Sequence, residues 1–349
     1  EYPRLVLPWM SKKMMRSRFP QHTSFKLYAS QFEPCPFSLK CFLSVERCHT
    51  ISSLTRVWKH TVTPFRLAFN TLQHTTTRFD TIVDKNRSLK ISLGNQFIPA
   101  MSYTFTYDNA PLKKRNNLWW ETSFTSAGNL TSLVYAAFGK GFKETDKKLL
   151  NSPYAQFLKM TSEVRCLFKV GEKQHIATRL MGGILYAYGN QTVAPYSEQF
   201  YIGGANSIRA FTVRSIGPGS YRPEDKQYGY LDETGDVKLE ANVEYRFPIL
   251  GDLYGAAFLD AGNVWLLREQ KNEEGENIRP GGLLTLRNFA KSVALGTGVG
   301  LRYDLTFLVI RLDLGIALHD PYDTGKKGYY NIPKFKDGLG LHFAIGYPF

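Results

Sequence analysis

The chain has 349 residues, of which 43% are hydrophobic, and its mean hydropathy is −0.28. No run of 18 or more apolar residues occurs, which excludes a transmembrane helix but not spanning strands, whose lipid-facing residues come at every second position. The formal net charge of +14 is spread over clusters in expected loops that lack interleaved aromatic residues. Solvated loops or contact with anionic lipid head groups explain these clusters, and nucleic acid is not an expected partner.

In chain order, the first half alternates between polar and apolar residues, which predicts strands rather than helices. The expected strands are residues 2–9, 23–33, 37–47, 53–66, 101–107, 118–127, 160–170 and 176–188. Residues 70–90 and 129–150 have the composition of loops with short helical pieces. Prolines interrupt the N-terminal strands, whose pattern is therefore the weakest.

Alternation is clearest in the C-terminal third. In Lys238–Arg246 every even position is charged or polar and every odd position is apolar, as a strand between lipid and a wet lumen requires. Further strands are expected around Phe258–Gly262 and at 291–303, 306–316 and 341–349, with a tight turn at 248–252 and polar loops at 267–290 and 318–338. A soluble sheet shows the same pattern in any one strand. With about 13 strands of roughly 9–11 residues, we predict an all-β transmembrane antiparallel β-barrel forming one domain over residues 1–349.

The stretch Gln199–Tyr221 is too rich in glycine and turn residues for a helix or a single strand. It contains Gly203 and Gly204, and then Ile208, Arg209, Ala210 and Phe211. We predict a long loop folded into the barrel, with Arg209 held by Asp260. A buried arginine and a buried aspartate cost several kcal/mol if unpaired but are tolerated as a hydrogen-bonded pair. From composition alone, a solvated arginine and a surface carboxylate remain the alternative.

Three further features bear on this loop and on the end of the chain. Asp260 shares its strand face with Phe258 and Gly262, and a second strand has Gly296, Gly298 and Gly300 on one face. Such a glycine face predicts that something packs closely on the backbone, and the inward loop is the expected neighbour. The last strand alternates through Phe343, Tyr347 and Phe349. Pro348 removes a ladder donor, so pairing is expected to end early and leave a weak seam.

Catalytic chemistry is not expected. The chain contains no nucleophile elbow, no metalloprotease motif and no phosphate-binding loop, and its carboxylates do not pair for acid–base work. Cys35, Cys41, Cys48 and Cys166 form no CxxC, and the histidines have no metal-ligand spacing. We therefore expect no enzyme, no catalytic residues, no cofactor and no metal. The first three cysteines are close enough in sequence for one disulfide, whose connectivity cannot be deduced.

The order of these motifs resembles the barrel of the BamA/TamA superfamily. The sequence has GGANSIRAF, then the alternating strand, FLDAG, GTGVGLRYD and a terminal aromatic strand. The likeness is strong over residues 175–349 and weaker over 1–174. The sequence of Ser207–Tyr221 is most similar to the TamA-like lipoprotein (TamL) branch. A BamA-type protein is the other candidate. The resemblance implies that residues 208–211 are the family's loop motif, with Ala210 where glycine is common, and that Phe258, Asp260 and Gly262 dock it.

The resemblance also implies a function and a place. Such barrels have roughly 16 strands, lie in the bacterial outer membrane, and insert or export other outer-membrane proteins through a seam that pairs with the incoming strand. The expected partners are outer-membrane lipid and lipopolysaccharide, client outer-membrane proteins, and periplasmic or lipoprotein accessory subunits. The expected strands are about three fewer than the roughly 16 of such barrels, so either N-terminal strands lie outside this chain or the N-terminal pattern shows too few of them. The POTRA domains are expected to lie outside this chain. A two-partner-secretion pore, a passive porin and a soluble lectin-like protein are the alternatives.

Overall fold

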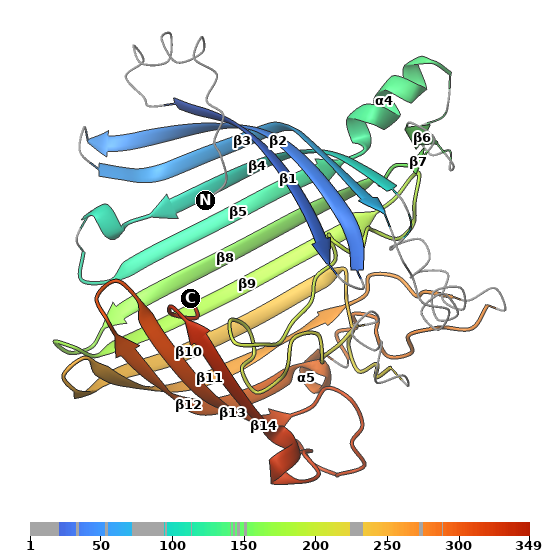
Figure 1. Ribbon diagram of the computed structural model, residues 1–349. Helices are drawn as coiled ribbons and strands as arrows, with labels where there is room; N and C mark the ends of the chain where they lie inside the picture. The colour runs from blue at the N-terminus through green and yellow to red at the C-terminus, as the bar shows by residue number, and fades with distance from the viewer. Residues whose placement is uncertain are drawn as a thin grey trace. The chain divides into compact units, whose positions relative to one another are not determined.

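The computed structural model is dominated by one antiparallel sheet of twelve strands (Figure 1). It describes residues 21–32, 35–52, 55–71, 94, 96–112, 114–139, 141, 144, 147–149, 152–223, 233–271, 275–287 and 289–349, with the backbone alone for 21–56, 70–71 and 96. The strands follow one another in the order β1-β2-β3-β4-β5-β8-β9-β10-β11-β12-β13-β14. No helix among these residues is long and apolar enough to cross a membrane.

The chain divides into two compact units. The first comprises the described residues of Glu1–Leu112, Trp120–Ser162 and Leu185–Glu198. Its elements are β1 (Gln21–Phe32), β2 (Cys35–Ser52), β3 (Thr55–Thr71), β4 (Gln96–Asp108), η1 (Ala110–Leu112), most of β5 (Asn117–Ala127), α4 (Asn129–Ala137), the two-residue strands β6 (Lys148–Leu149) and β7 (Ser152–Pro153), and the start of β8 (Phe157–Lys169). Antiparallel pairing runs from β1 to β2, from β2 to β3 and from β3 to β4.

The second unit contains the C-terminal strands. It comprises Lys113–Trp119, Glu163–Ile184 and the described residues of Gln199–Phe349. Its elements are most of β9 (His175–Ala187), then β10 (Val237–Leu250), β11 (Leu253–Trp265), α5 (Phe289–Ser292), β12 (Ala294–Asp304), β13 (Val309–His319), η3 (Phe335–Gly338) and β14 (Leu339–Ile345). The strands from β9 to β14 pair antiparallel in sequence order.

The burial pattern of β10 is the reverse of that in a water-soluble sheet. Glu240 and Glu244 are fully buried, whereas Val243 and Tyr245 are exposed. We call the face with the carboxylates the covered face, because residues 199–223 lie over it. A sheet that hides its charges and exposes its apolar side chains is suited to lipid on the exposed side.

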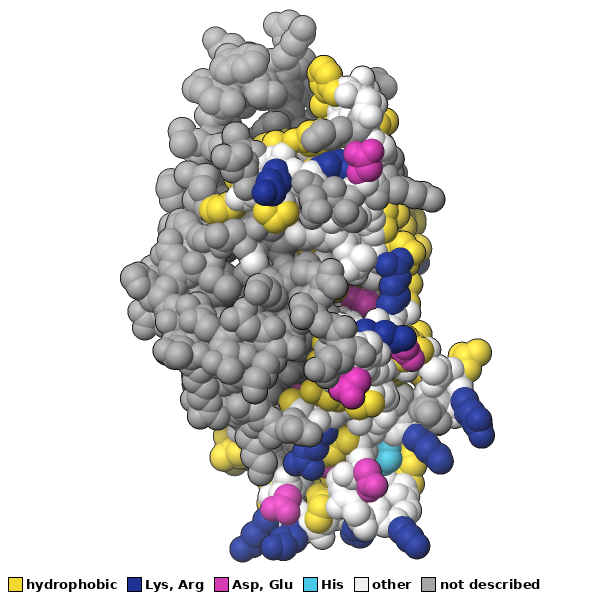
Figure 2. All heavy atoms as spheres, turned by 90° about the vertical axis from the view of Figure 1, so that its right-hand side faces the viewer, with side chains coloured by type: hydrophobic (Ala, Val, Ile, Leu, Met, Phe, Trp, Pro, Cys, Tyr) yellow, Lys and Arg dark blue, Asp and Glu magenta, His cyan; other side chains and the backbone are white. Residues whose placement is uncertain are grey.

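Twelve of the expected strands each overlap one strand of the sheet. The expected strand at 2–9 lies outside the described residues, as do residues 72–90 of the expected loop at 70–90. The expected tight turn at 248–252 joins β10 to β11, and the stretch 129–150 begins with α4. In the loop between β13 and η3, Lys326 and Lys327 are exposed. Lys and Arg side chains also gather at the lower end of the face in Figure 2.

Several strand boundaries differ from expectation, and three of them lie in the last three strands. β12 begins at Ala294 rather than 291, because Lys291 and Ser292 belong to α5, where the Ser292 hydroxyl donates to the carbonyl of Phe289 at 2.9 Å. β13 begins at Val309 rather than 306, because Thr306 has a φ of 71° in the preceding turn. The last strand stops at Ile345 rather than 349.

The end of β14 has a local cause. Gly346 adopts a φ of +84°, a backbone conformation that breaks the extended run. Its N–H still donates to the carbonyl of Val309 at 2.7 Å, but the next proline, Pro348, has no N–H to donate. The early end of pairing expected from Pro348 is therefore present, and the chain leaves the ladder two residues before the proline.

Candidate functional site: an arginine loop on the covered face

The loop that carries Arg209 is a compact element closed by its own backbone. The N–H of Gly204 donates to the carbonyl of Phe211 at 2.8 Å, and the N–H of Arg214 donates to the carbonyl of Ile202 at 2.9 Å. Gly203 and Gly204 have φ values of 99° and 92°, which residues with a Cβ rarely adopt. Successive positive-φ glycines therefore let the chain reverse and present residues 206–211 to the sheet.

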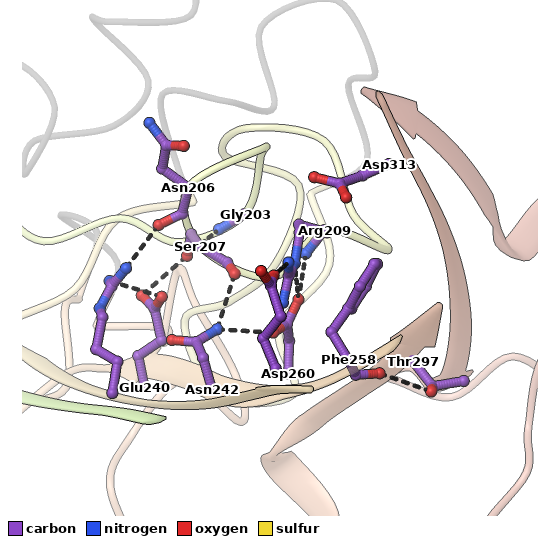
Figure 3. Close-up of polar contacts among 12 residues, drawn as sticks. Gly203, Asn206, Ser207, Arg209, Glu240, Asn242, Phe258, Asp260, Thr297 and Asp313 are labelled. Carbon is purple, nitrogen blue, oxygen red and sulfur yellow. Dashed lines mark hydrogen bonds and ion pairs between the residues drawn. The ribbon is translucent and has the colours of Figure 1, made fainter. Parts of the chain in front are cut away.

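Arg209 lies at the centre of the site (Figure 3). Its Nε and Nη2 donate to the two carboxylate oxygens of Asp260, each at 2.8 Å, and its backbone N–H donates to Asp260 Oδ2 at 3.1 Å. Its Nη1 donates to Glu244, and its guanidinium lies 3.5 Å from the ring centroid of Phe258. Arg209, Glu244 and Asp260 are each 0% exposed. A bidentate pair with a second carboxylate and an aromatic face compensates for the desolvation of this cation.

Glu244 extends the cluster towards β12 and β13. It accepts hydrogen bonds from Arg246 Nε at 2.7 Å and from Arg302 Nη2 at 3.1 Å. The Nη1 atom of Arg302 also lies 2.6 Å from an oxygen of Asp313. Buried cations and carboxylates thus alternate from the loop across the sheet. Removing one member leaves its neighbours with uncompensated charge in a low-dielectric environment.

A second group of contacts holds the loop at Asn206 and Ser207. The Asn206 carbonyl accepts from Arg179 at 2.8 Å, and its side-chain oxygen accepts from Arg311 at 2.6 Å. The Ser207 hydroxyl donates to Glu240 at 2.9 Å. Asn242 donates to both the Ser207 carbonyl and Asp260, each at 2.9 Å. The loop is therefore anchored to strands β9, β10, β11 and β13 by side chains that point from the covered face.

The glycine positions show where the loop approaches the sheet. A Cβ on Gly296 would come within 2.5 Å of the Ala210 Cβ, and one on Gly262 within 2.9 Å of Ile202 Cδ1. The remaining two glycines of the β12 face have other neighbours, contrary to expectation. A Cβ on Gly298 would meet the Phe258 ring at 2.5 Å, and the space over Gly300 is taken by charged side chains of β12 and β13. Of Gly296, Gly298 and Gly300, only Gly296 thus makes room for the loop itself.

The flanking loop residues are buried. Ile208 is 0% exposed, and Ala210 and Phe211 are also buried. The C-terminal aromatic residues do not share one strand face. Phe343 is exposed on β14, whereas Tyr347 and Phe349 follow the end of the strand and lie near Arg246, whose guanidinium is 4.2 Å from the Tyr347 ring centroid.

Sequence reasoning missed several members of the site, namely Arg179, Asn206, Glu240, Asn242, Glu244, Arg302, Arg311, Asp313 and Gly315. A signal for two of them was present. A tight turn at 248–252 sets the register of β10 on β11, which places Asn242 opposite Asp260 and Glu244 opposite Phe258. No comparable local signal identifies the members on β12 and β13.

Among the described residues, no three His, Cys, Asp or Glu side chains gather in a group that could hold an ion. Cys166 is a free thiol. The side chains of Cys35, Cys41 and Cys48 lie outside the described residues, so the disulfide stays a prediction.

The fold and the site define a class of protein: an all-β antiparallel sheet of barrel type, with apolar residues exposed and a glycine-turned loop packed by buried ion pairs on its polar face. Residues 60–349, more than half of the chain, match the Omp85 superfamily domain. The chain belongs to the Omp85 superfamily.

Individual relatives match shorter parts of the chain. The outer membrane protein assembly factor BamA of Neisseria meningitidis serogroup B is 32% identical over 88 residues, which are 24% of this chain and 11% of that protein. The sorting and assembly machinery component 50 homolog B of Xenopus laevis is 30% identical over 148 residues, which are 42% of this chain and 29% of that protein. These matches span less than a third of the length of either relative.

A solved structure supports the fold. BamA from Haemophilus ducreyi lacking POTRA domains 1–3 superposes with a TM-score of 0.56 at 14% identity, over 94% of this chain and 59% of that chain. The predicted fold class is thereby confirmed, although among the described strands no pairing joins β14 to β1. Membership of the superfamily is confirmed as well. One curated relative is bacterial and the other comes from an animal, so membership by itself does not identify a bacterial chain.

Proposed function

We propose that the protein is a non-enzymatic insertase or translocase of an outer membrane, which assembles or exports β-barrel or surface proteins. Support comes from membership of the Omp85 superfamily and from relatives named as an assembly factor and as a sorting and assembly component. The proposed site of action is a strand edge, because a strand paired on one side can accept an added strand.

The observation that carries this proposal is the short last strand. β14 pairs with β13 only over Leu339–Ile345, whereas β13 also pairs with β12 over nearly its whole length. The order of described strands ends at β14. A strand paired on one side presents unpaired N–H and C=O groups, which are a template for an added strand. We propose that a client strand pairs there before it leaves into the membrane.

The arginine loop has a separate role in this proposal. Its contacts with Asp260, Glu244 and Asn242 hold the loop on β10 and β11, and the packing of Ala210 on Gly296 extends the contact to β12. We propose that this brace keeps the wall in shape while the edge at β14 engages clients.

The proposed surroundings follow from the same assignment. We propose contact with outer-membrane lipid and lipopolysaccharide, with client outer-membrane proteins, and with periplasmic or lipoprotein accessory subunits, in a bacterial outer membrane. Within the superfamily, the residues at Ser207–Tyr221 favour the TamL branch. A BamA-type role is the other assignment, and genetic depletion followed by an outer-membrane proteome separates the two.

The test is a client-folding assay with the full chain in lipid vesicles. A urea-unfolded barrel client is added, and its folding is followed by heat-modifiable gel mobility. We expect faster folding than in empty vesicles, and photocrosslinking of the client to p-benzoylphenylalanine placed at Phe343 of β14. The same probe at Leu286, a loop residue 96% exposed, is the matched control.

Two results would overturn the proposal. Client folding at the rate of empty vesicles, with no adduct at Phe343, removes the insertase assignment. If large steady conductance in planar bilayers accompanies that result, a passive porin replaces it. Loss of a single exported protein on depletion would instead indicate a two-partner-secretion pore.

A further inference from the structure

Helix α4 follows β5. Its polar side contacts neighbouring residues of the first unit, and its apolar side is exposed. The Ser132 hydroxyl is buried, lies 2.7 Å from the Tyr154 hydroxyl and donates to Gln156 Oε1 at 2.9 Å. The Asn129 side-chain oxygen accepts from the Tyr188 hydroxyl at 2.6 Å and from Gln156 Nε2 at 3.2 Å. The polar residues of the helix thus make its attachment to the first unit.

The opposite side of the helix is a continuous apolar stripe. Leu130, Leu133, Val134 and Phe138 are 58%, 61%, 51% and 84% exposed. Leu133 and Val134 follow Leu130 by three and four residues, and Phe138 follows Val134 by four, so all four lie on one helical face. An apolar helical stripe of this kind would be an aggregation hazard in water, so its normal environment is expected to cover it.

We propose that α4 is an interfacial helix whose apolar stripe lies in the lipid at the membrane boundary. The stripe continues a surface that already faces lipid in the proposed orientation of the sheet. Trp120 and Phe124 are exposed on β5, and Leu158 and Met160 are exposed on β8, the strands that precede and follow this segment. Only Gly128 separates β5 from the helix, so α4 lies at the strand ends (Figure 1).

The helix cannot swing away from the strands. The N–H of Gly128 donates to the carbonyl of Pro99 at 2.7 Å, and a Cβ at Gly128 would come within 3.0 Å of the Gln156 backbone. The stripe is therefore held at one height relative to the exposed residues of β5. A helix of this length anchored at its start needs little further binding energy to stay in a lipid boundary.

The chain after the helix has a charge that suits lipid head groups. Residues 140–148 contain four lysines and two acidic residues. Of the lysines whose side chains the structure describes, Lys148 is exposed and Lys147 is buried. Tyr135 donates through its hydroxyl to the carbonyl of Lys148, which ties this basic segment to the helix. Apolar residues with adjacent lysines are the composition of helices that lie at an anionic membrane surface.

The inference rests on the proposed placement of the sheet in a membrane. The experiment distinguishes failure of the interfacial helix from failure of that placement. The full chain carrying p-benzoylphenylalanine at Leu133 is folded into phosphatidylcholine–phosphatidylglycerol vesicles with radiolabelled acyl chains and irradiated. The same probe at Phe124 reports lipid contact of the sheet, and the probe at Leu286 reports a loop. We expect acyl-chain adducts at Leu133 within about twofold of those at Phe124, and at least about tenfold above those at Leu286.

Each other outcome overturns the proposal in a distinct way. Adducts at Phe124 without adducts at Leu133 remove the interfacial helix and leave the membrane sheet. Adducts at neither position remove both. A crosslinked dimer at Leu133 in place of a lipid adduct shows that a second copy covers the stripe. Gel mobility of each folded variant is checked first, and Val134 serves as the second probe position if the Leu133 variant does not fold.

Discussion

At the scale of the residue, Arg209 is shared by two carboxylates rather than held by one. Asp260 accepts three hydrogen bonds from it, and Glu244 accepts a fourth. Glu244 is in turn surrounded by two further arginines, Arg246 and Arg302. The Arg209–Asp260 contact is therefore one link in a charge network, and its energetics depend on the neighbours.

A charge exchange tests this sharing. We expect Arg209→Ala and Asp260→Ala each to destabilise the folded chain by about 3–5 kcal/mol, because each leaves a buried charge uncompensated. The double variant Arg209→Asp, Asp260→Arg should recover little of this loss, because its new aspartate would lie beside Glu244. Urea midpoints read from gel mobility in vesicles measure all three variants.

The matched control is Arg165→Ala. Arg165 pairs with Glu163 at 2.7 Å, but its side chain is 42% exposed, so the loss should stay below about 1 kcal/mol. Near-complete recovery in the double variant would show that Asp260 alone holds Arg209, contrary to the network.

At the scale of the element, close packing rather than charge sets how near the loop comes to the sheet. Gly315 on β13 lies beneath residues 209 and 210, and Gly296 on β12 lies beneath Ala210. A larger side chain at either position would separate two surfaces that are joined by buried hydrogen bonds. Overpacking of this kind is destabilising even when the added group is a single methyl.

We expect Gly315→Ala to displace the loop and to lower stability by about 1–3 kcal/mol. Its Cβ would come within 2.5 Å of the Arg209 carbonyl carbon and 2.7 Å of the Ala210 Cα. Gly182→Ala is the control, because a Cβ there meets nothing within 4 Å, and its effect should lie within about 1 kcal/mol of the parent. Tryptic cleavage within residues 199–223 and urea midpoints report the difference, and equal behaviour of the two variants would contradict the packing argument.

At the scale of the whole molecule, the distribution of apolar residues identifies the solvent. The exposed side of the C-terminal strands carries Leu312, Leu314, Leu341 and Phe343, whereas Arg302, Arg311 and Asp313 are fully buried. In water this arrangement would leave large apolar patches exposed. In lipid, the same arrangement lets the exposed apolar residues contact hydrocarbon while the charged groups stay buried away from it.

Folding is therefore expected to require lipid or detergent. Chain diluted from urea into lipid vesicles should gain heat-modifiable gel mobility, and chain diluted into buffer alone should aggregate. The physical reason is that the native state buries its charges and exposes its apolar surface, so only a hydrocarbon solvent favours it over collapse. Gel mobility and light scattering measure the two outcomes, and a soluble folded monomer in buffer would contradict the proposed membrane placement.

Much of the fold was determined by local sequence. The period-two alternation of segments such as Lys238–Arg246 predicted the strands, because a strand with different solvents on its two faces must alternate. The glycine-rich stretch around Gly203 predicted the loop, whereas composition alone left a solvated Arg209 as the alternative, and the resemblance to a known family favoured its burial. The tight turn at 248–252 fixes the register of β10 on β11, which places Asp260 and Glu244 on the same face of the sheet. The position of Glu244 beside this site was not among the predictions.

Tertiary structure alone decided the rest. Glu244 on β10 meets Arg302 on β12, and the long connection after Trp265 and before Ala294 lies between these two strands in the chain. Periodicity carries no information about register across such a connection. Arg302 in turn meets Asp313 on the neighbouring strand β13. The end of β14 depended on the positive φ of Gly346, which alternation cannot reveal. The sequence by itself thus determined where most of the strands lie and which side chains share a face within a strand such as β10. The folded sheet decided which of those side chains meet, because contacts between distant strands depend on register and on the packing of the loop between them.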